Sequence, residues 1–168
     1  MGEWKLAKAD TLNYVDDLRA IFPKYSYSNK AHSIATDEVV CAHVVGQLHK
    51  AKALLFQCID RIYNSGGYTR EFESKLRMLR DDMDIFSDEI KVRLCKWEGL
   101  DEARLSSMVK KDAMLVKLCS RLNSKAEGLL AITNSEVNLK AAEQRAVEVG
   151  KALEEIVVEF KEREAVCK

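Results

Sequence analysis

The sequence predicts an all-α protein: an up-down-up-down four-helix bundle of long antiparallel helices, with a short extra helix at the N-terminus. Apolar residues recur at intervals of three and four along five segments, which places them on one face of each helix. Glycine (7) and proline (1) are few, while 47% of the 168 residues are hydrophobic and 32% are charged. This composition is too apolar for disorder and too poor in turn formers for a β sandwich. The length fits a single domain, residues 1–168.

The first segment predicts a short helix that ends before Pro23, because proline cannot continue a helix and restricts the residue before it. A polar connector follows, from Lys24 to Ala35. Thr36 is the predicted N-cap of the first long helix, and Asp37 in the first turn suits the positive end of the helix dipole. We therefore expect a leader helix and connector over 1–35 and the bundle over 36–168.

Three further long helices are predicted. Thr69 caps the second, whose apolar residues extend to Trp97 and which ends at Gly99. Asp101 begins the third, with Leu100 and Leu105 on either side of the cap as in a hydrophobic staple. The pattern from Thr133 to Glu136 is that of a capping box, with Ile132 and Val137 as a second staple, and predicts either a break or a kink before the last helix. Arg163 then suits the negative end of that helix's dipole.

Asp112 interrupts the apolar face of the third long helix. One interpretation places it in the interior, where a buried carboxylate needs a partner. The other rotates the helix so that Val109 and Val116 face inward and Asp112 faces water.

Three glycines, Gly46, Gly128 and Gly150, lie inside predicted helices, where each costs about 1 kcal/mol relative to alanine. Close packing against a neighbouring helix is one explanation. For Gly150, which falls on the apolar side with Ala146, space for an inserted group is the other, and the sequence does not choose between them.

Charge and composition limit the function classes. The 27 basic and 27 acidic residues cancel, so we expect no nucleic-acid or membrane partner. No apolar run reaches the ~20 residues of a spanning helix and the first residues lack a signal peptide's apolar core, which predicts a cytoplasmic protein. The five cysteines form no C-x-x-C pair and are expected to be reduced.

No metal site or cofactor is predicted. The E-x-x-H spacing of di-iron bundles does not occur, and His43 and His49 are about 120° apart on a helix, too far to hold one ion together. Arg77 and Arg80 each lie four residues before an aspartate of the acidic stretch from Asp81 to Glu89, which predicts a solvated stripe of weak ion pairs. No catalytic residue is identified; whether the protein is an enzyme stays open, and a non-enzymatic role is favoured.

One family resemblance is confined to a short part of the chain. Residues 35–39, followed by Leu48 and the run 50–55, resemble the first bundle helix of the corrinoid adenosyltransferases. The resemblance implies the same long-helix bundle architecture. That family's nucleotide-binding lysine and glycine loop, and its later arginine and asparagine positions, are missing here, so the resemblance assigns no site residue.

Two functional hypotheses remain. The first is association without catalysis, as a homo-oligomer or with a helical protein partner, because apolar residues flank the main stripes: Val45, Leu54, Val116, Leu118 and Leu130. The second is a bundle that binds a small ligand or nucleotide under the 23–35 connector, where polar and aromatic residues precede a helix N-terminus. The candidate ligand-binding residues are Lys24, Tyr25, Tyr27, Lys30, His32 and Asp112.

Overall fold

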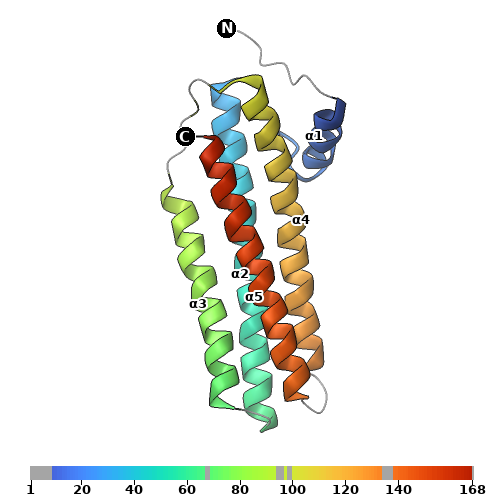
Figure 1. Ribbon diagram of the computed structural model, residues 1–168, viewed down its shortest axis with the longest axis vertical. Coiled ribbons are helices and arrows are strands. Elements are labelled where there is room, and N and C mark those ends of the chain that lie inside the picture. The colour runs from blue at the N-terminus through green and yellow to red at the C-terminus, as the bar shows by residue number, and fades with distance from the viewer. Residues whose placement is uncertain (1–8, 67–68, 94–96, 98–99, 134–137, 168) are drawn as a thin grey trace.

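The computed structural model describes residues 9–66, 69–93, 97, 100–133 and 138–167, which contain five α-helices and no strand. The helices are α1 (Ala9–Ile21), α2 (Lys30–Ser65), α3 (Arg70–Val92), α4 (Glu102–Ile132) and α5 (Leu139–Val166). Helices α2 to α5 run alternately down and up as a bundle, and the short α1 lies outside it against α4 (Figure 1). The predicted fold class is confirmed.

The bundle consists of two antiparallel hairpins laid side by side. Helix α2 packs on α3, and α4 packs on α5; the hairpins then meet through α2 with α4 and α3 with α5. Helices α3 and α4, although consecutive, have no close backbone contact among the described residues. The end of α3 and the start of α4 lie at the same end of the bundle (Figure 1). We call this end, where α1 also lies, the leader end, and the opposite end the far end.

Helix α2 begins seven residues earlier than predicted. Its N-cap is Asn29, whose side-chain oxygen accepts a hydrogen bond from the backbone N–H of His32 at 2.9 Å. Thr36 is not a cap but lies buried inside the helix. Its hydroxyl accepts from the N–H of Ser26 at 3.0 Å and donates to the carbonyl of Ser26 at 2.9 Å. The prediction for Thr36 was wrong because its hydroxyl bonds the backbone of the connector at Ser26. Asn29 instead accepts a hydrogen bond from a free backbone N–H in the first turn of the helix.

The other helix ends agree in part with the sequence. Thr69 and Asp101 are the N-caps of α3 and α4, as predicted. Helix α3 ends at Val92, earlier than the predicted Gly99, which lies outside the described residues.

Helices α4 and α5 are separate, so of the two predicted alternatives the break is found rather than the kink. Thr133 is the C-cap of α4 rather than an N-cap, and Asn138 caps α5 by accepting from the N–H of Ala141 at 3.1 Å. Glu136 and Val137, the remaining parts of the predicted capping box and staple, lie outside the described residues.

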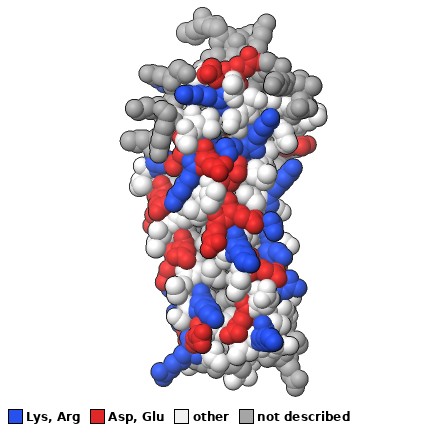
Figure 2. All heavy atoms as spheres, in the orientation of Figure 1, with Lys and Arg blue, Asp and Glu red and all other residues white. Residues whose placement is uncertain are grey.

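The surface shows acidic and basic side chains interspersed over the face in view, as expected of a chain with zero net charge (Figure 2). Ion pairs link neighbouring helices, for example Lys52 of α2 with Asp84 of α3 at 2.6 Å. In the acidic stretch, Arg80 pairs with Asp81 and Lys91 pairs with Asp88. The predicted stripe of exposed ion pairs is confirmed, although with other partners than those four residues apart.

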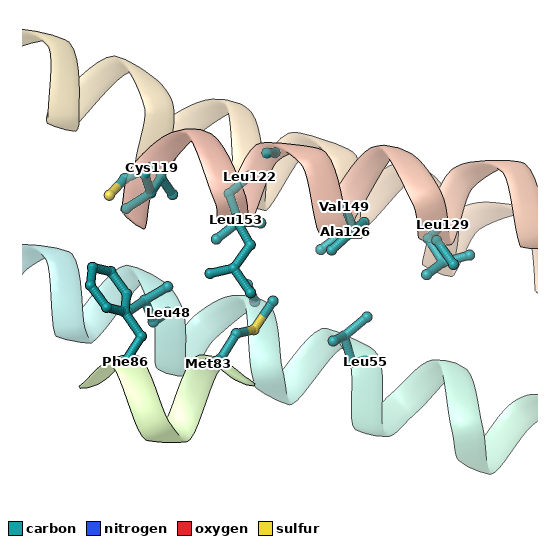
Figure 3. Packing of buried hydrophobic residues seen from close by; sticks show 14 of the residues in the cluster. Leu48, Leu55, Met83, Phe86, Cys119, Leu122, Ala126, Leu129, Val149 and Leu153 are labelled. Carbon is teal, nitrogen blue, oxygen red and sulfur yellow. The ribbon is translucent and has the colours of Figure 1, made fainter. Parts of the chain in front are cut away.

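Buried apolar residues form two clusters. The main core fills the four-helix bundle, and Figure 3 shows Leu48 and Met83 pointing toward Leu122 and Leu153 across its interior. The second, which we call the leader cluster, lies between α1, the connector and the start of α4. Its members are Val15, Leu18, Phe22, Tyr25, Tyr27, Val40, Trp97, Leu100, Leu105, Met108, Val109, Ala113 and Cys167. Leu100 and Leu105, the predicted staple around Asp101, are both buried in it.

Three of the cysteines are buried free thiols: Cys41, Cys58 and Cys119. Burial raises the pKa of Cys41 and Cys58 to about 11 and that of Cys119 to about 12, so these thiols stay protonated near neutral pH. Cys167 is disulfide-bonded. The expectation that all cysteines are reduced is therefore wrong for Cys167.

Candidate functional site

Asp112 lies at the centre of a buried polar network at the leader end. Its side chain has no exposed surface, so the interpretation that places it in the interior is correct. Val109 is also buried, whereas Val116 is only partly so. Both Asp112 and Val109 can face inward because α4 is covered by the bundle on one side and by α1 and the connector on the other.

The carboxylate of Asp112 is satisfied entirely by protein groups. The hydroxyls of Tyr25 and Tyr27 each donate to Oδ2 at 2.6 Å. Nε of Arg163, from the last turn of α5, donates to Oδ1 at 2.5 Å. Three charge-assisted hydrogen bonds of this kind compensate the loss of hydration that burial imposes on a carboxylate.

Arg163 extends the network across the bundle. Its Nη1 donates to Oδ1 of Asp37 in α2 at 2.7 Å, and its Nη2 donates to the hydroxyl of Tyr27 at 3.1 Å. Oδ2 of Asp37 accepts from Nη2 of Arg93, which directly follows α3. Two carboxylates and two guanidinium groups thus cancel in charge while joining all four bundle helices to the connector.

The network shifts the pKa of two tyrosines and one arginine further away from neutral pH. Burial, and then the charge of Asp112, raise the pKa of Tyr25 and Tyr27 well above the usual value of 10. Burial disfavours the charged form of Arg163, but Asp112, Tyr27 and Asp37 outweigh it and raise the pKa of its guanidinium. Both tyrosines are therefore neutral and Arg163 is charged at neutral pH, which suits a structural role.

The structure separates the six predicted ligand-binding residues. Tyr25, Tyr27 and Asp112 come together, but by bonding one another inside the protein. Lys24 borders a small groove of about 310 Å³ between the connector and α2. His32 is exposed and lies 2.7 Å from the hydroxyl of Ser28. The connector is folded into the leader cluster, where the rings of Tyr27 and Trp97 stack at 5.6 Å.

Lys30 instead borders a much larger cleft, of about 1160 Å³, between α2 and the end of α3. The cleft is lined by Lys30, Ile34, Asp37, Glu38, Cys41, Ala42, Val45, Gly46, His49, Ile90, Lys91, Arg93 and Trp97. At Arg93 the guanidinium is nearly enclosed, since the side chain is 9% exposed. Its Nη1 is buried and has no hydrogen-bond partner within the described ranges of the chain. The cleft therefore borders the polar network, and Arg93, which lines it, carries a buried donor without a described partner.

Three important residues, Asp37, Arg93 and Arg163, were missed as site residues. The sequence offered dipole explanations for Asp37 and Arg163 because each falls in a terminal turn of its predicted helix. A different signal was available for both: Asp37 lies three residues before Val40 and Arg163 three after Phe160, so each continues an apolar stripe. A charge in register with a buried face requires a buried partner. Nothing comparable marks Arg93, which follows the end of its helix.

Among the described residues, no three His, Cys, Asp or Glu side chains are close enough to hold a metal ion. None of the described helices combines the length and apolar character needed to cross a bilayer. No family model matches the sequence, and no curated protein or solved structure is similar enough to count as a match.

Proposed function

We propose that this protein acts without catalysis, by binding a helical segment of another protein along the outer face of α3. The observation behind this is an exposed apolar line: Met78, Ile85 and Val92 are 63%, 59% and 79% exposed. The flanking residues first considered for association do not offer such a surface. Val45, Leu54, Val116, Leu118 and Leu130 are partly buried against the two clusters.

The spacing of the line suits a helix as partner. Met78, Ile85 and Val92 follow one another at intervals of seven, so they form a straight row two turns apart along α3. The opposite face of α3 is already occupied, because Phe72, Met83 and Phe86 are buried in the main core. Burying a side chain of this kind contributes about 1.5–3 kcal/mol, which favours covering the row with apolar residues of a second helix.

The charges beside the row favour a basic partner over a second copy. Asp81, Asp82, Asp88 and Glu89 flank it, and all four are exposed. Asp82 and Glu89 have no ion-pair partner among the described residues. Two copies meeting through this face would place these carboxylates opposite one another, which is unfavourable, whereas lysines or arginines flanking an apolar stripe would complement them.

A designed probe tests this proposal. A synthetic amphipathic helix with leucines at heptad spacing and flanking lysines should bind with an affinity that falls as salt rises, measured by fluorescence anisotropy. The same peptide with flanking glutamates should not bind. Ile85→Ser should weaken binding, while Val158→Ser, an equally exposed valine of α5, should not.

Equal binding of the two peptides, or binding unaffected by Ile85→Ser, would contradict the proposal. Light scattering provides the remaining comparison. We expect a monomer, and a dimer that Ile85→Ser dissociates would favour self-association through the same face.

A further inference from the structure

The cleft between α2 and the end of α3 is lined by Arg93, one of whose N–H donors has no partner in the part of the chain that the structure describes. Nη2 of Arg93 donates to Asp37, and the guanidinium lies 5.3 Å from the ring centroid of Phe160, yet Nη1 has no acceptor among the described residues. A buried N–H without a partner costs free energy, and most buried donors in proteins are satisfied. Arg93 cannot simply turn into water, because its side chain is held from two sides and more than nine-tenths buried. An acceptor entering from the cleft would complete the group.

Gly46 provides a second, independent observation. It lines the cleft in the middle of α2, and a Cβ atom placed there would meet nothing within 4 Å. Close helix packing therefore does not explain this glycine. It does explain Gly150, where a Cβ would lie 3.2 Å from Cδ2 of Leu79. The open space at Gly46 leaves room in the cleft for a bound group.

The lining of the cleft indicates what kind of group would enter. Lys30, Lys91 and Arg93 carry positive charge, whereas Asp37 and Glu38 carry negative charge. Asp37 is already bonded by Arg163 from inside the bundle at 2.7 Å, so it repels an incoming anion less than a lone carboxylate would. The rest of the lining is largely apolar and includes Ile34, Val45 and Trp97. One anionic head and an apolar body match this combination.

We propose that this cleft binds an amphipathic carboxylate, with its head accepting hydrogen bonds from Nη1 of Arg93 and its apolar body lying over Gly46 against Val45 and Trp97. The site is separate from the exposed row on α3 and does not depend on it. Cys41 also lines the cleft. Because burial raises the pKa of its thiol to about 11, it is protonated at neutral pH, and binding is reversible rather than covalent.

Fluorescence quenching at Trp97 tests the site directly. The chain has two tryptophans, so Trp4→Phe leaves Trp97 as the only one. Bromine quenches tryptophan fluorescence on contact. In this background 10-bromodecanoate should quench Trp97 saturably at neutral pH, and the neutral 10-bromodecan-1-ol should bind about tenfold more weakly because it lacks the charge that Arg93 recognises.

Two matched glycine variants keep the test independent of folding. Gly46→Phe should fill the cleft and abolish quenching, whereas Gly128→Phe should leave it unchanged, since Gly128 also has open space around it but lies outside the cleft. Circular dichroism checks that both fold. Arg93→Gln should reduce the affinity for the acid to that for the alcohol.

Absence of saturable quenching would overturn the proposal, as would quenching that survives Gly46→Phe. Equal affinity for acid and alcohol would overturn the role of the carboxylate.

Discussion

The two ends of the bundle are built on different principles. At the far end, apolar side chains from all four helices close on one another, as with Leu55, Phe72, Leu129 and Val149. At the leader end α3 has already finished at Val92, and the space is filled by the connector and a charged network. Apolar packing tolerates changes that preserve volume, whereas hydrogen-bonded charges require particular partners at particular positions. We infer that the network fixes how the leader segment is seated on the bundle.

The largest effect in this comparison is expected from Asp112→Ala. It leaves the buried Arg163 without its closest partner and the hydroxyls of Tyr25 and Tyr27 without an acceptor. Removing one member of a buried ion pair costs about 3–5 kcal/mol, and we expect a loss of this size in the free energy of unfolding, measured by urea denaturation.

The matched control is Glu127→Gln, on the same helix. Glu127 forms an ion pair with Lys50 at 3.1 Å, but its side chain is 54% exposed, and a change within about 1 kcal/mol is expected. A similar cost for both variants would mean that the buried network contributes no more than a surface pair.

At the far end, we expect a substitution that preserves side-chain volume to be tolerated. Leu55→Ala removes a fully buried side chain and should cost about 2–5 kcal/mol, but Leu55→Met, which keeps the volume, should cost less than about 1.5 kcal/mol. At the leader end, even the isosteric Asp112→Asn should be costly, because it removes the charge that compensates Arg163. Denaturation of the variants compares the two ends directly, and a well-tolerated Asp112→Asn would remove the distinction.

Alkaline pH should weaken the leader end through its two buried tyrosines, in addition to the effect of the buried thiols of Cys58 and Cys119 in the main core. The pKa of Tyr25 and Tyr27 is raised in the folded state, so above pH 10 the unfolded chain loses these protons first and unfolding becomes more favourable. Their contribution is constant below about pH 10 and then falls by about 1.4 kcal/mol per pH unit for each tyrosine. A Tyr25→Phe/Tyr27→Phe variant, although less stable at pH 7, should show a shallower decline in denaturation curves taken from pH 9 to 11. If the free energy of unfolding fell equally steeply with pH in the wild-type protein and in the variant, the two tyrosines would not be responsible for the decline.

The same contrast explains how much the sequence predicted. The apolar period is repeated over many residues, so no single residue decides it. The helices, their bundle and the main core could therefore be predicted from periodicity alone. Ends of helices depend on single side chains, which is why Thr36 was mistaken for a cap while Asn29 was overlooked.

The polar network is harder still, because it depends on contacts between distant parts of the chain. Asp37 and Arg163 are 126 residues apart, and only the folded bundle brings them together. The sequence did mark Asp112 as a charge in an apolar register, with its partner left open. Nothing local in it indicated that Tyr25 and Tyr27 would turn inward to that carboxylate rather than outward to a ligand.

The smallest expected effect distinguishes open from packed helix faces. Gly46→Ala at the cleft and Gly128→Ala on α4 should each stabilise the protein by about 0.5–1 kcal/mol, because alanine is the better helix former and both sites have room for a methyl group. Gly150→Ala should gain little or nothing, since its Cβ would lie 3.2 Å from Cδ2 of Leu79 and α3 would have to give way. Thermal unfolding of the three variants measures the difference. Equal stabilisation at all three positions would show that the side chain of Leu79 yields freely, and that the approach of α3 to α5 does not require a glycine.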